Sequence, residues 1–367
     1  MTPDVAEKYQ PLLERFRDGK RIGLARAITV VENEQSGFEA FLHEVLSAGP
    51  QGARVGVTGP PGAGKSSLIS MLAAHYRKAE EHVGVVAVDP TSPYSGGALL
   101  GDRIRMNDLA TDPGIFIRSM ATRGSLGGLA TTSKEVIDLM DAFGLPRILI
   151  ETVGVGQTEL DVTGAADTVV VVLVPESGDG VQAMKAGLME IADIFVVNKA
   201  DRPGADRLLK ELSQAIHLRT GPGNDSTAGG RDMPAHHGVD MAAAMKKENE
   251  ERGVTKEPRR WEPPEGWQIP VLKTVAQTGE GVPELVEAIA SHRDHLVNSG
   301  ELATRRRART ERRVRDVVER RLRRRAEQAV SGEALHETME RILGGSDTPY
   351  SVASGFIRAI LDRELEG

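Results

Sequence analysis

Short runs of aliphatic and β-branched residues recur between residues 52 and 217 and are separated by stretches of helical periodicity. Each run is apolar almost throughout, which indicates strands that are buried on both faces. We therefore predict an α/β fold with a mostly parallel central sheet flanked by helices. The predicted strands are Ala53–Thr58, Val83–Asp89, Ile115–Arg118, Arg147–Glu151, Thr168–Val174, Ile194–Asn198 and, after an interruption, Pro270–Thr274.

The two ends of the chain are helical instead. Leu12, Leu13 and Phe16 fall on one helical stripe near the N-terminus. Val314, Val318 and Leu322, together with Val317, share one face of a tail helix, and such a face must pack on something. Between Ile194–Asn198 and Pro270–Thr274, residues 218–266 are rich in Gly, Pro, Asn, Asp and Lys without an apolar period, which indicates an inserted loop.

We expect three parts in the chain. Residues 1–48 form an N-terminal helical extension, residues 49–298 form the α/β domain with the insertion 218–266, and residues 299–367 form a C-terminal helical arm. A short helix near Met241–Glu251 is expected inside the insertion.

Composition narrows the classes of chemistry. The chain has no Cys, which excludes disulfides, thiolate nucleophiles and Cys-ligated metal centres. Its longest aliphatic run, Val169–Val174, is far shorter than the roughly 18 residues of a membrane span. The N-terminus carries Asp4, Glu7 and Lys8 and lacks the apolar core of a signal peptide. We expect a cytoplasmic protein with no membrane partner.

Charge is distributed unevenly. The formal net charge is -7, yet residues 305–325 hold twelve Arg against Glu311, Asp316 and Glu319. The remaining surface is therefore acidic and repels nucleic acid, so nucleic acid is not expected as a partner. The Arg-rich helix is interpreted as part of an arm with a solvated basic face.

One octapeptide carries the strongest local signal. It matches the phosphate-loop pattern G-x-x-x-x-G-K-[ST], follows a predicted strand and precedes a predicted helix that starts near Ser66. Backbone N–H groups of such a loop wrap phosphates, the Lys reaches the β- and γ-phosphates, and the hydroxyl ligates Mg²⁺. The nucleotide-binding residues predicted here are Gly59, Pro60, Pro61, Gly62, Ala63, Gly64, Lys65, Ser66 and Ser67.

Two further segments indicate a guanine base. Asn198, Lys199 and Asp201 form an N-K-x-D signature at the end of a predicted strand. The Asp201 carboxylate can accept from guanine N1–H and the 2-amino group together, whereas adenine offers neither donor there. After the strand ending at Thr274, Val275-Ala276-Gln277 stands where many GTPases supply a main-chain N–H to guanine O6. The expected ligands are GTP and GDP.

Acidic residues at strand ends are candidate metal ligands. Glu151 and Gly154 occupy the positions of a D-x-x-G motif, in which the Gly N–H reaches the γ-phosphate. The acids Asp89, Asp102 and Glu151 are candidates to complete a Mg²⁺ environment with Ser66, and a solvated loop acid is the alternative for Asp102. Val155 stands where Ras-like enzymes place a water-orienting Gln, so we expect slow hydrolysis until a partner binds.

Nearly the whole chain resembles the metallochaperone GTPases of adenosylcobalamin-dependent acyl-CoA mutases, the bacterial MeaB and ArgK type and the human methylmalonic aciduria type A protein, of the SIMIBI class. The motifs that carry this resemblance are Gly59–Ser67, Val88–Ser92, Gly101–Arg103, Glu151–Gln157, Val174–Lys185 and Asn198–Asp201.

The resemblance implies a homodimer with a central GTPase domain, an N-terminal helical extension and a C-terminal dimerisation arm. It implies slow GTP hydrolysis that the mutase accelerates, and gating of adenosylcobalamin loading and of mutase reactivation. It also implies that Ser66, Asp89, Asp102 and Glu151 surround Mg²⁺. The chain lacks a D-x-H-x-x-G cobalamin motif, so adenosylcobalamin is expected on the partner.

A polar segment after Val174 has a separate role in this interpretation. Asp179, Gln182 and Lys185 recur every three residues and so share one helical face beside a Ser177-Gly178 hinge. The resemblance implies that they form a switch that relays the nucleotide state to the mutase, in a transition of the order–disorder kind. We count them, with Lys65, Glu151 and Gly154, among the catalytic residues.

Other functions stay open at this point. A GTPase that inserts another metal, such as nickel, usually carries Cys or His clusters, and this chain has no Cys and nine scattered His. A GTP-switched partner-binding protein is a second alternative. A kinase of transport proteins is a third, but no protein-kinase catalytic loop is present.

Overall fold

The computed structural model describes residues 3–47, 49, 51–89, 109, 111–121, 131–152, 161–175, 187–220, 266–329 and 333–365. The chain divides into two compact units, Met1–Leu302 and Ala303–Gly367. Among the described residues, no helix is both long enough and apolar enough to cross a membrane.

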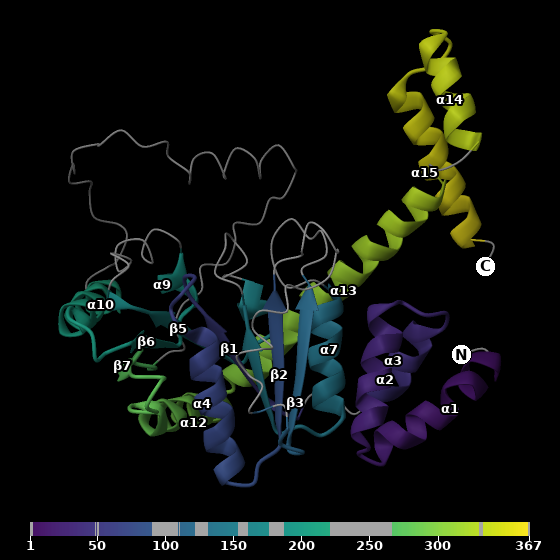
Figure 1. The fold of residues 1–367 in the computed structure, drawn as a ribbon. Helices are drawn as coiled ribbons and strands as arrows, with labels where there is room; N and C mark the ends of the chain where they lie inside the picture. Colours follow the sequence, from purple (N-terminus) through teal and green to yellow (C-terminus); the bar gives the residue numbers. More distant parts are fainter. Residues whose placement is uncertain are drawn as a thin grey trace, which may run out of the picture. The chain divides into compact units, whose positions relative to one another are not determined.

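A seven-stranded sheet forms the centre of the first unit (Figure 1), and each pair of neighbouring strands in it is parallel. The strand order is β3-β2-β4-β1-β5-β6-β7. This arrangement confirms the predicted α/β class with a parallel sheet. The strands are β1 (Ala53–Thr58), β2 (Val83–Asp89), β3 (Ile115–Ala121), β4 (Arg147–Glu151), β5 (Thr168–Leu173), β6 (Ile194–Asn198) and β7 (Val271–Thr274).

The strand bounds differ little from those expected. β3 continues three residues beyond Arg118, because the parallel pairing with β2 extends through Asp89 and Ala121. β7 begins at Val271, since Pro270 has no N–H for a ladder and contributes only its carbonyl, which accepts from Phe195 N.

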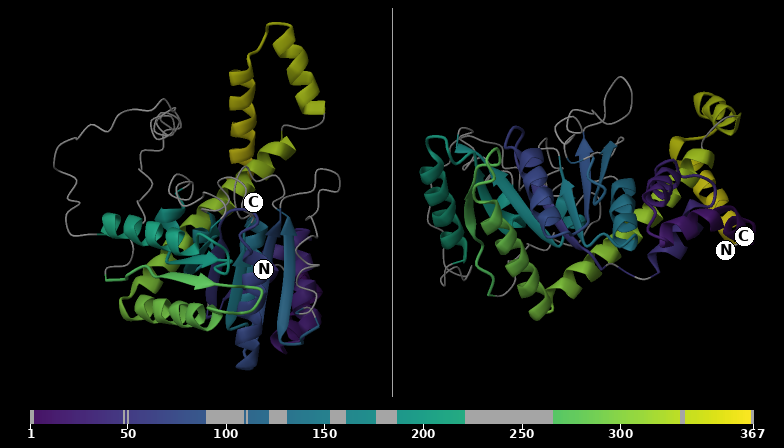
Figure 2. Two further views of the ribbon diagram at one scale, coloured as in Figure 1. Left: turned by 60° about the vertical axis from the view of Figure 1, so that its left-hand side comes forward. Right: turned by 60° about the horizontal axis from the view of Figure 1, so that its bottom comes forward.

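Helices cover both faces of the sheet (Figure 2). On one face, α4 (Lys65–Lys78) packs over β1, and α12 (Val282–Asn298) packs beside α4 over β5 and β7. On the other, α7 (Thr131–Ala142) and α10 (Ala205–Thr220) pack with the alternate residues of the strands. The short elements η2 (Asp161–Gly164) and α9 (Leu188–Ile191) complete this second layer.

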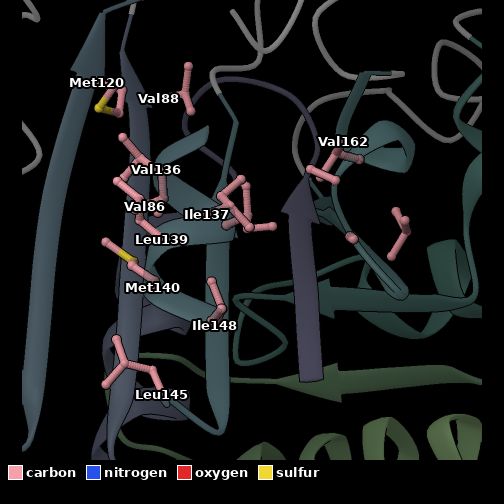
Figure 3. Close-up of a cluster of buried hydrophobic side chains, with 14 of the residues drawn as sticks. Val86, Val88, Met120, Val136, Ile137, Leu139, Met140, Leu145, Ile148 and Val162 are labelled. Carbon is pink, nitrogen blue, oxygen red and sulfur yellow. The ribbon is translucent and has the colours of Figure 1, made fainter. Parts of the chain in front are cut away.

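Figure 3 shows how the α7 layer is filled. Ile137 and Met140 of α7 are fully buried and lie among Val86 of β2 and Ile148 of β4. Burial of a large aliphatic side chain contributes about 1.5–3 kcal/mol to stability. A shift of one residue in strand pairing would turn these side chains to the other face of the sheet, so their burial fixes the strand register.

Three N-terminal helices pack against the same side of the unit, next to α7 (Figure 1). They are α1 (Pro3–Arg17), α2 (Arg21–Glu32) and α3 (Phe38–Leu46). Leu24 and Ile28 of α2 are fully buried, and Phe16 of α1 meets Phe143 edge-on at 5.3 Å between ring centroids. An ion pair between Glu32 and Arg118 ties α2 to β3.

A buried arginine anchors the start of β1. The Arg54 guanidinium donates to Asp141 Oδ2 at 2.8 Å and to Asp138 Oδ1 at 2.8 Å. Burial by itself lowers the pKa of Arg54, but the carboxylates of Asp138, Asp141 and Asp167 outweigh it and hold that pKa above its ordinary value. Asp141 Oδ1 also accepts from the N–H groups of Gln51 and Gly52, which fixes the entry to the sheet.

The second unit is helical. Its elements are α13 (Glu301–Ala329), which begins just before the unit, α14 (Glu333–Leu343) and α15 (Pro349–Leu365). No residue of α13 is buried, and the stripe expected to pack is largely exposed, with Val314 58%, Val318 49% and Leu322 53% accessible. On α15, Tyr350 is 85% exposed.

A hydrogen-bonded His at the amino edge of the sheet joins α12 to two strands. His292 is fully buried, with Nδ1 2.9 Å from Thr168 Oγ1 and Nε2 3.3 Å from Asp193 Oδ1. Asp193 Oδ2 accepts from Val169 N at 2.8 Å, and the Trp267 ring lies 4.8 Å from the imidazole between ring centroids.

We predict that His292→Ala lowers the free energy of unfolding by about 3 kcal/mol, since it opens a cavity and removes the hydrogen bond between the imidazole and buried Thr168 Oγ1. Denaturant unfolding followed by circular dichroism measures the change. His295→Ala is the matched control, because His295 stacks on the same Trp267 ring at 5.5 Å but is partly exposed. Equal losses for the two variants would contradict the assigned role of the buried network.

Candidate nucleotide site

The loop of residues 59–64 connects β1 to α4 at the carboxyl edge of the sheet. β1 is the central strand of the sheet. The order continues through β4, β2 and β3 on one side of it and through β5, β6 and β7 on the other. Ligands of open α/β sheets bind at this point, outside the carboxyl ends of the strands. The topology therefore places the phosphate-loop sequence where this fold holds ligands.

Glycines shape the loop at two close approaches. Gly59 has φ +136°, and a Cβ there would lie 2.1 Å from Val172 O of β5. Gly64 has φ +87°, and a Cβ there would lie 2.4 Å from Asn198 Nδ2. Neither position tolerates a side chain, since a Cβ within 3.0 Å forces a shift and positive φ is strained for other residues.

The first residues of α4 bring two polar side chains to the loop. Lys65 Nζ donates to the carbonyls of Gly59 at 2.8 Å and Pro60 at 3.0 Å, which places the ammonium at the inner side of the loop. Ser66 Oγ donates to Glu151 Oε1 at 2.7 Å. Ser66 and Glu151 are 7% and 4% exposed, so a hydroxyl and a carboxylate meet in a largely buried place.

Asn198 connects three segments of the site. Its Nδ2 donates to Ala63 O of the phosphate loop at 2.8 Å. Its Oδ1 accepts from Thr274 Oγ1 and from Ala276 N, both at 3.1 Å. The side chain is 2% exposed. The guanine signature, the phosphate loop and the 275–277 loop are thus held together by one amide.

The other residues of the N-K-x-D signature stand at the surface. Lys199 has φ +56°, a left-handed conformation that is uncommon for a residue other than Gly. Ala200 N donates to Thr274 O at 3.1 Å, which turns the chain so that Asp201 is exposed. The carboxylate of Asp201 is therefore available to a base from solvent.

Hydrogen bonds within the protein determine which main-chain N–H group of the 275–277 loop can meet a ligand. Val275 N donates to Glu280 O at 3.0 Å, and Ala276 N donates to Asn198. Of the three predicted positions, Gln277 is the one whose N–H has no acceptor among the described residues. A base contact from this loop is therefore expected from Gln277.

Some predicted site residues are brought together and others fall outside the described part of the chain. The phosphate loop, Ser66, Ser67, Glu151, Asn198, Lys199, Asp201 and residues 275–277 lie around the carboxyl ends of β1, β4, β6 and β7. Asp89 ends β2, but its side chain is not among those described. Outside the described residues lie Asp102, Gly154, Asp179, Gln182, Lys185, and the helix expected at Met241–Glu251.

Sequence reasoning missed three threonines. Thr274 braces Asn198, and Thr152 Oγ1 donates to Thr58 Oγ1 at 2.9 Å directly beneath the phosphate loop. Thr274 is 76 positions from Asn198 in the sequence, and Thr152 is 94 positions from Thr58, so no local motif marks these threonines.

The oxygen donors of Ser66 and Glu151 suit a hard divalent cation that a bound ligand also coordinates. Among the described residues, no three His, Asp or Glu side chains gather to hold a metal by themselves. A hydroxyl and a carboxylate, supplemented by phosphate oxygens, are the ligands that Mg²⁺ prefers. The pair Ser66 and Glu151 therefore fits a metal that arrives with a nucleotide.

The chain is similar to known proteins in sequence and in fold. The family model described as methylmalonyl Co-A mutase-associated GTPase MeaB matches residues 24–331. A putative GTPase of Pyrococcus horikoshii is 43% identical over 352 residues, which cover 96% of this chain and 98% of that protein. The mouse mitochondrial methylmalonic aciduria type A homolog is 32% identical over 323 residues, which cover 83% of this chain and 69% of that protein.

A solved structure shares the fold. The crystal structure described as LAO/AO transport system kinase matches with a TM-score of 0.62 at 24% identity. The match covers 98% of this chain and 99% of that one, so the similarity extends over the whole fold.

We predict that Gly64→Ala weakens GDP binding by about tenfold or more, because its Cβ displaces the Asn198 amide and the positive φ adds about 1–2 kcal/mol of strain. Fluorescent GDP titration measures the affinity. Gly62→Ala is the matched control, since Gly62 has φ +77° but no atom within 4 Å of its Cβ position. If both variants lose affinity equally, backbone strain and not the Asn198 contact explains the effect.

Proposed function

The chain belongs to the MeaB family of GTPases, and on that premise we propose that it is a Mg²⁺-dependent GTPase that serves as chaperone to an adenosylcobalamin-dependent acyl-CoA mutase. In this role it gates loading of the cofactor into the mutase and reactivation of the enzyme. The family description and the mouse relative's name support a mutase as partner.

The observation that carries the proposal is the junction made by Asn198. A base read by Asp201 and a triphosphate held at 59–66 need loops at a fixed separation, and one buried amide bonds to both sides. A ligand that fills both places must have a base at one end and phosphates at the other. GTP has this shape, and its N1–H and 2-amino donors match the Asp201 carboxylate.

The residues present fit a magnesium ion beside the γ-phosphate. Ser66 and Glu151 would hold it, and Asp89 and Asp102 remain candidates from the sequence. A bound Mg²⁺ would neutralise charge on the phosphate oxygens during phosphoryl transfer. Lys65 reaches the same oxygens with its ammonium, and the loop N–H groups orient the phosphates for attack by water.

The topology supports transmission of the nucleotide state. β4 and β5 are the two neighbours of β1, so the chain leaves both strands beside the phosphate loop. The segment with Gly154 follows β4, and the segment with Asp179, Gln182 and Lys185 follows β5. Loss of the γ-phosphate would remove contacts of these segments and change the surface that the mutase meets.

We predict slow GTP hydrolysis by the protein alone and an increase of about 100-fold with its acyl-CoA mutase, the effect of one added donor at a developing charge. Phosphate release measures the rate, with ATP as the control for base selectivity. Lys65→Ala should hydrolyse nothing in either condition, because the phosphate charge loses its cation. Unchanged rates with methylmalonyl-, isobutyryl-, ethylmalonyl- and 2-hydroxyisobutyryl-CoA mutases would refute the chaperone role.

We also propose that the protein is a homodimer joined by the helices of residues 299–367. The exposed stripe of Val314, Val318 and Leu322 supports this proposal, since isolated helices rarely expose such a face to water. Tyr350 and Ile357 of α15, 85% and 58% exposed, add to the unpartnered apolar surface.

Removal of residues 300–367 should yield a monomer that still binds GDP, because the nucleotide loops lie wholly in the first unit. Light scattering after size exclusion measures the mass. Val318→Glu in the full chain is the finer variant, since it places a charge in the proposed interface without shortening the chain. A truncated protein that stays dimeric would contradict the arm assignment.

A further inference from the structure

The strands β1 and β4 lead to the Ser66–Glu151 pair, since β4 ends at Glu151 and β1 is followed, after the phosphate loop, by α4 with Ser66. Their parallel pairing is in register from Ala53 with Arg147 to Val57 with Glu151. Thr58 and Thr152 follow these residues at the next position of each strand. Side chains at successive positions point to opposite faces of a sheet, so the two threonines share the face that Glu151 does not use.

The threonines continue the pairing beyond the last ladder residues. Thr152 N donates to Val57 O at 3.3 Å, and Thr152 Oγ1 donates to Thr58 Oγ1 at 2.9 Å. Thr58 is fully buried and Thr152 is 2% exposed. A hydrogen bond in such a dry place is not weakened by competition with water.

On the opposite face, Ser66 Oγ donates to Glu151 Oε1 at 2.7 Å. The end of β4 is therefore held on both faces of the sheet, to α4 through Ser66 on one face and to β1 through Thr58 on the other. Thr58 immediately precedes Gly59, and Thr152 immediately follows Glu151. The Thr58–Thr152 hydrogen bond thus sets the spacing between the start of the phosphate loop and the Glu151 carboxylate.

We propose that the Thr58–Thr152 hydrogen bond is a positioning element that holds Glu151 against Ser66 in the geometry that binds Mg²⁺ with a nucleotide. This inference rests on the proposed function, since it concerns the metal that accompanies GTP. Neither threonine touches the ligand, and both act through Glu151. A purely structural role predicts a loss of stability alone, whereas a positioning role predicts a loss of the metal's contribution to nucleotide affinity.

The test measures the affinity for a fluorescent, non-hydrolysable GTP analogue in excess EDTA and in saturating Mg²⁺. The ratio of the two dissociation constants reports the metal's contribution without any turnover. Thr152→Val keeps the shape and removes the hydroxyl. We expect it to reduce the ratio by about fivefold to tenfold, with the affinity in EDTA unchanged.

Three further variants separate the explanations. Thr152→Ser keeps the hydroxyl and should retain the wild-type ratio. Thr58→Val should reproduce the loss, and it serves if Thr152→Val does not fold. Thr168→Val is the matched control, because Thr168 is also buried and hydrogen-bonded but lies at the other edge of the sheet. It should lower thermal stability and leave the ratio unchanged.

A wild-type ratio in Thr152→Val and Thr58→Val would overturn the inference and leave the proposed function intact. An equal loss of affinity with and without Mg²⁺ would overturn it as well, since that result describes general damage to the loop. A wild-type protein whose ratio is near one would instead refute the magnesium dependence in the proposed function, and the positioning role with it.

Discussion

The nucleotide site depends on the buried amide of Asn198. Its Nδ2 and Oδ1 satisfy a carbonyl of the phosphate loop and an N–H of the 275–277 loop, and both bonds lie away from solvent. A buried amide that lost one of these partners would leave polar atoms unpaired at a cost of about 1–3 kcal/mol each. The separation of the base-reading and phosphate-binding loops is therefore set by the same bonds that stabilise the fold.

The parallel sheet supplies the rest of this constraint. Because all strands point the same way, their carboxyl ends meet at one edge, and the polar residues that follow them gather there. The amino edge holds a different kind of residue, Arg54 and His292, which are themselves buried and bond to side chains of the same unit. One edge of the sheet is thus built for stability and the other for a ligand.

The sequence could predict the fold class because apolar runs and helical periods are local signals, and the structure confirms the parallel sheet between helices. It could also indicate the phosphate loop and the N-K-x-D segment, since each is contiguous. It could not indicate that Asn198 meets Ala63 and Ala276, which are 135 and 78 positions away. That meeting depends on strand order, which the periodicity of single segments does not encode.

The same reasoning explains why the threonine pair was missed. Thr58 and Thr152 are 94 positions apart, and each alone looks like an ordinary residue at the end of a strand. Their relation exists only once β1 and β4 are neighbours in a particular register, because a shift of one residue would turn either side chain to the other face.

A densely packed frame of this kind has a consequence for how the nucleotide state is transmitted. Ser66, Glu151 and Asn198 are all less than a tenth exposed, and packed interiors resist continuous deformation. A change of one phosphate group therefore cannot be absorbed by gradual movement of these residues. Under the proposed function, it is expressed in the segments that follow β4 and β5 in the sequence, the two strands that flank β1. On the proposed function, a rigid site and a switching surface are two results of one packing arrangement.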